Sequence, residues 1–148
     1  MSLWAWALET YALEGVPEAC LTLQDEHGQN VPFLLWAIWA ETVEPELLAR
    51  AAAAAKVWDT AAVKPLRAVR RALKASLPPI DDDVREGLRE DVKAAELHAE
   101  RVLLETLAAM SGHHKGGARA LDALRAAAKA WGLPVSDEAL AVLAEALR

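Results

Sequence analysis

Apolar residues recur along this chain at the spacing of an α-helix, and no other feature constrains the fold as strongly. Val16, Cys20 and Leu23 follow one line at steps of four and three residues, which places them on one helical face. Alanine and leucine dominate a composition that is 54% hydrophobic, whereas β-branched residues are sparse. Because alanine and leucine favour helices and β-branched residues favour strands, the sequence predicts an all-α fold.

The spacing of caps, glycines and prolines predicts about six to seven helices. A chain of 148 residues can remove roughly 70% of its unfolded surface from water, so we expect one helical domain over residues 1–148. Pro65 cannot donate a hydrogen bond to residue 61, which predicts a break or kink between Asp59 and Lys64. The segment from Ala55 to Lys74 is therefore either one kinked helix or two, with Asp59 or Thr60 capping the continuation.

Two helices are expected to lie inside the bundle. The third, from Val31 to about Thr42, is apolar on every side, which is typical of a central buried helix. The longest, from Asp81 to about Met110, carries two apolar lines in its second half and should pack on more than one side. In the first helix, Trp4, Leu8 and Tyr11 are expected to form the apolar face.

A polar corner, LQDEHGQN, separates the second predicted helix from the third. Gly28 can close the second helix, and either Asn30 or Val31 can cap the third. The apolar line of the second helix leads on to His27, with Gln24 beside it, so these polar groups should turn inward.

The corner has two interpretations. It could bind a small polar ligand against a wall formed by Trp36, because pockets combine apolar walls with a few convergent polar groups. The candidate ligand-binding residues are Gln24, Asp25, His27, Gln29, Asn30 and Trp36. Alternatively, the polar side chains satisfy backbone groups at two helix ends. We favour this structural interpretation, since capping explains Gly28 and Asn30 and leaves only Gln24 and His27 unexplained.

The sequence offers no assembled catalytic or metal-binding pattern. Helical di-metal sites need a glutamate three residues before a histidine, but Gln24, Ala95, Met110 and Ser111 occupy that position before the four histidines. His113 and His114 are expected to be solvated loop residues. Proton transfer by His27 and Asp25 is a nonspecific possibility. We therefore predict no catalytic residue, no metal and no cofactor, and lean against an enzyme.

The charge distribution argues against nucleic acid as a partner. The net charge is -6, which opposes general attraction to phosphate backbones. A basic run from Lys64 to Lys74 is followed, across the Pro78–Pro79 corner, by an acidic run from Asp81 to Asp91. Antiparallel helices would bring the two runs together, so we expect them to pair within the chain.

The sequence predicts a soluble cytoplasmic protein. Its longest uncharged stretch, Gly28 to Ala40, is well short of the roughly 20 residues that span a membrane. No basic leader precedes the first helix, which argues against a targeting signal. The single cysteine, Cys20, lies on an apolar line and cannot form an internal disulfide, which favours a reducing compartment.

Two stretches resemble an uncharacterised bacterial family of helical proteins that carries an unknown-function label. The first is LWAWALETYALEGVPEACLTLQDEHGQNVPFLLWAIWA, with the hallmark LQDEHGQNVPFLLWAIW, and the second is VKAAELHAERVLLETL in the long helix. Pro32 departs from the family pattern, in which a polar residue is more common. The resemblance implies a helical fold and carries no activity.

The leading functional hypothesis is a non-enzymatic binding or protein-interaction module, with a protein partner or a homo-oligomer. Six tryptophans support it, because aromatic residues are enriched in interface cores. Trp4 and Trp6 lie roughly 200° apart around a helix, so one of them should be exposed. The alternative is a small-molecule binding protein or enzyme at the Gln24 to Asn30 corner. A weaker alternative is a nucleic-acid-associated regulator acting through Lys64 to Lys74.

Overall fold

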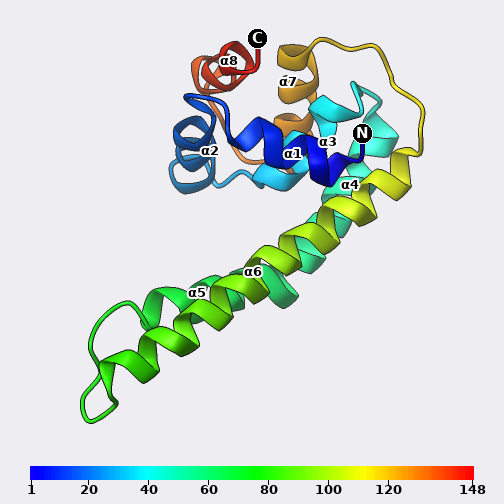
Figure 1. Cartoon of the computed structure of the whole chain (residues 1–148). Coiled ribbons are helices and arrows are strands. Elements are labelled where there is room, and N and C mark those ends of the chain that lie inside the picture. Colours follow the sequence, from blue (N-terminus) through cyan, green and yellow to red (C-terminus); the bar gives the residue numbers. More distant parts are fainter. The chain divides into compact units, whose positions relative to one another are not determined.

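A computed structural model describes all 148 residues and contains helices without strands, which confirms the all-α prediction. The helices are α1 (Leu3–Tyr11), α2 (Val16–Asp25), α3 (Val31–Trp39), α4 (Pro45–Trp58), the π-helix η1 (Asp59–Val63), α5 (Lys64–Ala72), α6 (Asp82–Ser111), α7 (Ala120–Trp131) and α8 (Asp137–Ala146) (Figure 1). Because α4, η1 and α5 follow one another without a break, the chain has seven helical segments, as predicted. None of its helices combines the length and apolarity needed to cross a membrane.

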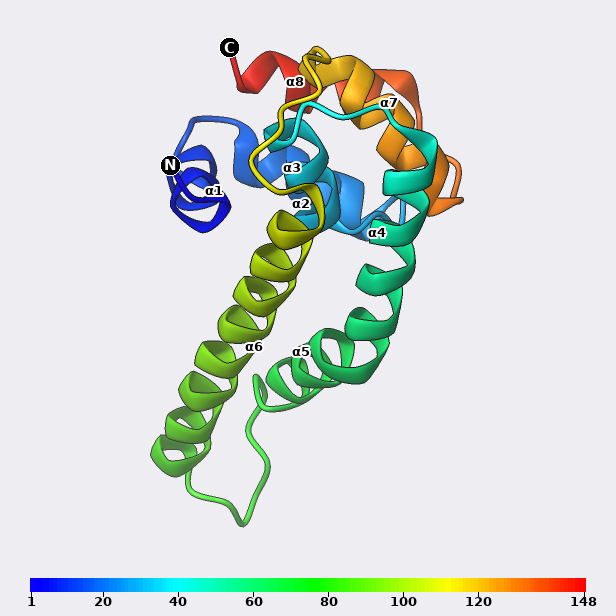
Figure 2. The same ribbon diagram turned by 90° about the vertical axis from the view of Figure 1, so that its right-hand side faces the viewer.

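The chain forms two compact units, which are described separately. The core unit comprises Met1–Ala55 and Leu104–Arg148, and the hairpin unit comprises Lys56–Leu103. In the hairpin unit, α5 and the amino-terminal part of α6 run side by side in opposite directions, joined by the corner at 73–81 (Figure 2). The expectation of one domain over residues 1–148 stays a prediction.

The core unit is organised around α3. Phe33, Leu34, Leu35 and Trp36 are at most 1% exposed. The Phe33 ring lies 5.9 Å from the Trp36 ring and 5.7 Å from the Trp131 ring of α7, measured between centroids. α3 packs on α7, α2 packs on α8, and α7 and α8 pack on each other. The prediction of a central buried third helix is confirmed.

The predicted apolar face of α1 was wrong. Leu3, Ala7 and Thr10 are the buried residues of this helix, whereas Leu8 is 52% and Tyr11 is 43% exposed. Both lines have helical spacing, so the pattern alone allowed two faces. The structure buries the line with the smaller side chains. Trp4 and Trp6 are both half-buried.

The chain around Pro65 remains helical. The Lys64 N–H donates to the Asp59 carbonyl, five residues back, in the register of a π-helix. This wider register accommodates Pro65, which has no N–H and whose ring would collide with the preceding turn of a regular α-helix. The ambiguous segment is therefore one continuous helical run. The prediction that Asp59 or Thr60 caps the continuation was wrong, because the helical run passes through both residues without a break.

Two capping residues define the junction between α7 and α8. Gly132 closes α7 in the left-handed conformation at φ 98°, and the Ser136 hydroxyl accepts the Ala139 N–H at 3.2 Å to begin α8. In α6, Ala99, Leu103 and Leu107 are buried. Leu97, which belonged to one of the two predicted apolar lines, is 52% exposed. The second half of α6 is thus buried along only part of the surface that the sequence suggested.

Candidate functional site

The polar corner between α2 and α3 first of all joins two helix ends. Gly28 adopts φ 63°, and the Gln29 N–H donates to the Leu23 carbonyl at 3.0 Å. The Asn30 side chain accepts the Phe33 N–H at 3.0 Å, so Asn30 rather than Val31 caps α3. These bonds satisfy backbone groups that helix ends leave without intrahelical partners.

The same corner is fastened to the loop after α7. The Trp131 indole donates to the Gly28 carbonyl at 2.9 Å, and the Gln29 amide donates to the Leu133 carbonyl at 3.2 Å. A Cβ at Gly28 would lie 2.7 Å from the Leu133 side chain, and the positive φ strains any residue other than glycine. Gln29 is 3% exposed, and its Oε1 has no hydrogen-bond partner. The corner therefore connects two helix ends to the loop after α7. It leaves one buried polar atom, the Gln29 Oε1, without a hydrogen bond.

The other candidate residues of the corner are dispersed. Gln24 is half-buried and donates to the exposed Asp25 at 3.4 Å, and His27 is half-buried. Trp36 is 0% exposed, and its indole donates to the Ser111 hydroxyl at 3.1 Å, so it presents no surface to a ligand at the corner. The structure therefore gathers Gln29 and Asn30 at the corner and places Trp36 in the core. Ligand binding at the corner stays a prediction.

A pocket that the sequence did not reveal lies beside the loop between α3 and α4. It has a volume of about 460 Å³. Polar groups from distant parts of the chain line it, among them Thr42, Glu44, Arg50, Ser111 and His114. Arg50 and His114 could hold a small anion, but the Glu44 carboxylate shares the lining and would repel it. Because the lining carries both signs of charge, it does not favour one class of ligand.

The pocket rests on two loops bonded to each other. The Gly116 and Ala118 N–H groups donate to the Ala40 and Glu41 carbonyls, both at 2.9 Å. Lys115 donates to the Trp39 carbonyl, and its ammonium lies 3.3 Å from the centre of the Trp39 ring. Burial lowers the pKa of Lys115, while Glu41 opposes that shift. In the sequence, only the glycine pair after Lys115 indicated an unusual backbone in these loops.

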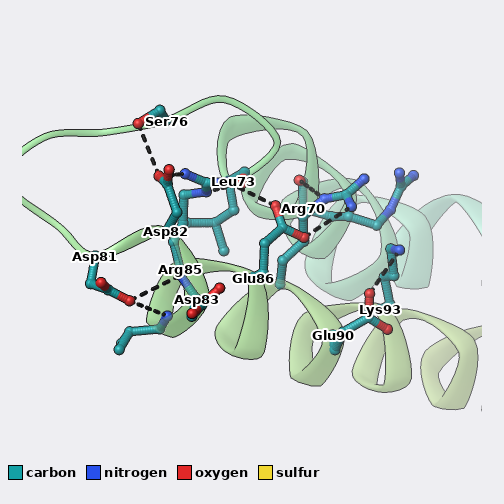
Figure 3. Close-up of polar contacts among 12 residues, drawn as sticks. Arg70, Leu73, Ser76, Asp81, Asp82, Asp83, Arg85, Glu86, Glu90 and Lys93 are labelled. Atoms are coloured by element: carbon teal, nitrogen blue, oxygen red, sulfur yellow. Dashed lines mark hydrogen bonds and ion pairs between the residues drawn. The ribbon is translucent and has the colours of Figure 1, made fainter.

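The hairpin unit holds the main cluster of charged contacts. Glu96 on α6 accepts from Arg70 of α5 at 2.5 Å and from Arg67 at 3.4 Å. From α6, Arg85 donates to the Leu73 carbonyl at 3.0 Å, and Arg89 donates to the Arg70 carbonyl at 3.3 Å. Figure 3 shows Arg70, Leu73 and Arg85 within this network. Ion pairs and hydrogen bonds thus join the two antiparallel helices.

The predicted pairing of the basic and acidic runs occurs in a different form. Arg67 and Arg70 of the basic run pair with Glu96, which lies beyond the acidic run. Within the acidic run, Asp82 and Glu86 pair with Arg85 of the same helix (Figure 3). The hydrogen bond from Arg85 lowers the pKa of Glu86. Burial raises the pKa of the Glu100 carboxyl, and repulsion by Glu96 raises it further.

The hairpin exposes an apolar side. Five residues whose side chains join α5 to α6 are each directly preceded by an apolar residue: Leu66 before Arg67, Val69 before Arg70, Val84 before Arg85, Leu88 before Arg89 and Ala95 before Glu96. In two antiparallel helices, the residues that precede the facing ones lie on the same side of the pair. We call this set of five residues the hairpin face. Val69 is 45%, Val84 69% and Leu88 53% exposed.

Two kinds of reactive group can be assessed directly, clustered metal ligands and the single thiol. No three His, Cys, Asp or Glu side chains are grouped so that they could hold a metal ion. Cys20 is 1% exposed, and burial raises the pKa of its thiol to about 11. A thiol with this pKa is protonated at neutral pH and is a poor nucleophile.

A family model of proteins of unknown function, DUF2390, matches residues 2–107. The match includes both stretches on which the resemblance was based, and it runs through the whole hairpin unit between them. No curated protein and no solved structure matches the chain significantly. The chain belongs to the DUF2390 family of proteins of unknown function.

Proposed function

We propose that this protein is a non-enzymatic, cytoplasmic protein-interaction module that binds its partner through the hairpin face. The observation that carries the proposal is the exposure of Val69, Val84 and Leu88 on one side of a hairpin whose helices are joined by ion pairs. Contiguous exposed apolar side chains are typical of surfaces that bind another protein. The single, buried thiol of Cys20 is consistent with a reducing compartment.

The ion pairs and hydrogen bonds that join α5 to α6 support this function physically. The ion pairs and carbonyl bonds of Arg67, Arg70, Arg85 and Arg89 fix the two helices without using the side chains of the hairpin face. An apolar surface that is ordered before binding loses less conformational entropy when a partner docks. The arrangement thus suits a preformed docking surface.

A photo-crosslinking experiment tests the proposal with a matched control on the same helix. A photoreactive amino acid replaces Leu88 of the hairpin face, or Leu97, which lies outside it and is 52% exposed against 53% for Leu88. After irradiation of living cells, we expect protein adducts from position 88 at least about tenfold more abundant than from position 97. Equal yields at both positions, or no adduct at position 88, would contradict the proposed function.

A second candidate function, small-molecule binding at the Gln24 to Asn30 corner, is favoured by the unsatisfied Oε1 of Gln29. A buried acceptor without a partner costs about 1–3 kcal/mol, which a ligand donor could recover. A panel of amino acids, nucleotides and sugar phosphates is screened for an increase in melting temperature. A hit that is lost when Gln24 and His27 become alanine supports this function. Retention of the shift in that variant argues against it.

A further inference from the structure

We infer that a groove between α2 and α8 of the core unit binds a basic amphipathic helix of another protein. The inference is independent of the hairpin face, which belongs to the hairpin unit. It follows from an apolar hollow at the surface of the core unit and from carboxylates that lie along both of its edges.

The groove has a floor of small side chains. α2 packs on α8 (Figure 1), and the helices come close at Gly15, where a Cβ would lie 3.7 Å from the Cβ of Ala146. Between the two helices is a hollow of about 460 Å³, which we call the α2–α8 groove. Ala19, Ala139 and Val142 supply apolar lining. The volume falls within the range of binding sites in proteins, about 300–1,000 Å³.

The groove is open to solvent. Val142 lines it and is nevertheless 54% exposed. An open apolar groove between two packed helices is the shape that accepts a third helix, whose apolar side chains enter it at steps of three and four residues.

Carboxylates lie along both edges of the groove. On α2, Glu14 and Glu18 belong to the lining and are exposed. On α8, Glu138 lies four residues before Val142 and Glu145 lies three residues after it, so both share its side of the helix. The negative charges therefore flank the apolar floor on each helix.

Three of these four carboxylates have no cationic partner within the chain. Glu145 pairs with Arg148 at 3.2 Å, whereas Glu14, Glu18 and Glu138 form no ion pair. The first 49 residues contain no lysine or arginine, and α8 contains none. An apolar floor with negative edges complements an apolar stripe with positive edges. Nucleic acids and anionic membranes would be repelled, so the geometry points to a basic helix of a protein.

Fluorescence anisotropy with a labelled synthetic peptide tests the groove. The probe is an amphipathic peptide of about 18 residues, with leucine along one helical face and lysine along the other. At low ionic strength, we expect the full chain to bind it at least about tenfold more tightly than the same peptide with alanine in place of leucine, because leucine fills the groove. Equal binding of the two peptides, or no binding, would overturn the inference.

Two double variants locate the binding site while the net charge is held equal. Glu14→Gln with Glu18→Gln removes two charges from the groove, and Glu44→Gln with Glu46→Gln removes two exposed charges elsewhere in the core unit. Glu18 and Glu46 both lie in the first turn of a helix, so each variant loses the same kind of interaction with a helix dipole.

We expect the groove variant to bind the leucine–lysine peptide about tenfold more weakly than wild type, and the control variant to stay within about twofold. Equal weakening would mean that the peptide responds to overall charge or binds at another surface, and it would overturn the inference.

A charge placed in the floor separates apolar contact from charge attraction. Val142→Asp adds a negative charge, which by itself would strengthen the attraction of a lysine-rich peptide. Because it also puts a carboxylate where leucine should dock, we expect binding to weaken by at least about tenfold. Leu8→Asp on α1, where Leu8 is 52% exposed, should stay within about twofold.

Tighter binding to Val142→Asp, or equal effects of the two substitutions, would overturn the inference. Circular dichroism checks that every variant keeps its helices. None of these positions lies in the hairpin unit, so the outcome is separate from that of crosslinking at position 88.

Discussion

The core unit buries Phe33, Trp36 and Leu107 completely, whereas α5 of the hairpin unit has no buried residue. Phe33 and Trp36 lie in an apolar interior, where removal of large side chains from water supplies the stability. In the hairpin unit, α5 is instead joined to α6 through Glu96, which receives hydrogen bonds from Arg67 and Arg70. Ion pairs and hydrogen bonds contribute less net stability than apolar burial. The difference teaches that the hairpin is suited to presenting a surface, whereas the core unit is stabilised by its own interior.

The largest effect should come from truncating a leucine in the core unit. Leu107 and Leu88 both lie on α6, but Leu107 is 0% and Leu88 is 53% exposed. We expect Leu107→Ala to lower the free energy of unfolding by about 2–5 kcal/mol, because it leaves a cavity. Leu88→Ala should change it by less than about 0.5 kcal/mol. Urea unfolding at low protein concentration measures both free energies. Similar losses would contradict the expected difference between the core unit and the hairpin unit.

The next largest effect should come from Glu96, the carboxylate that pairs with two arginines in the hairpin unit. Glu96→Ala would leave Arg67 and Arg70 without their carboxylate, and we expect a loss of about 2–3 kcal/mol from the free energy of unfolding. Glu90→Ala, which removes an exposed pair with Lys93 at 3.0 Å, should cost less than about 0.5 kcal/mol. Both are measured by urea unfolding. Equal effects would mean that Glu96 contributes no more than a surface ion pair.

Much of the core unit could be predicted from the sequence, because burial of a helix and its caps depend on residues that are close together in the chain. An all-apolar helix must be buried, which located α3. Asn30 acts on its own neighbours, so the sequence could offer it, with Val31, as the cap of α3. The buried face of α1 could not be predicted from the sequence, because two sets of residues have helical spacing and only packing decides which set is buried.

The candidate surfaces were harder to predict because they depend on residues distant in sequence. Composition suggested that the basic run would meet the acidic run directly after it, but Arg67 and Arg70 reach Glu96 instead. The hairpin face becomes visible only when the residues that bond across the hairpin are known, because its five members look like ordinary helical apolar residues. The pocket beside Arg50 likewise depends on the bonds from Gly116 to Ala40 and from Ala118 to Glu41, which no sequence pattern encodes.

Thiol labelling compares the local stability of the two units. Cys20 is 1% exposed with a thiol pKa of about 11, so at pH 8 only roughly one thiol in a thousand is ionised. We expect its modification in the native protein to require opening of the core unit. In a Cys20→Ala background, Val63→Cys places a thiol at a position that is 4% exposed in the hairpin unit. It should react at least about tenfold faster, because fewer apolar contacts oppose opening.

Each labelling rate is divided by the rate of the same variant in denaturant, which removes differences in intrinsic thiol reactivity. The ratio then reports the opening of the surrounding structure. If both thiols react at equal corrected rates, the two units open together, and the contrast between them does not extend to dynamics.

The smallest effect comes from Glu100, where the hairpin unit carries a charge that opposes folding. Burial and the neighbouring Glu96 raise the pKa of Glu100 in the folded chain above its unfolded value. The folded state therefore binds the proton more tightly, and stability falls as the pH rises through the window between the two values. We expect Glu100→Gln to raise the free energy of unfolding at pH 7 by up to about 1 kcal/mol. Because protonation neutralises the wild-type carboxyl, this gain should shrink towards zero below the unfolded pKa, and urea titrations at pH 7 and pH 3.5 measure it. A gain that persists at low pH would have to come from packing, and Glu100 would then be no part of the electrostatic difference between the two units.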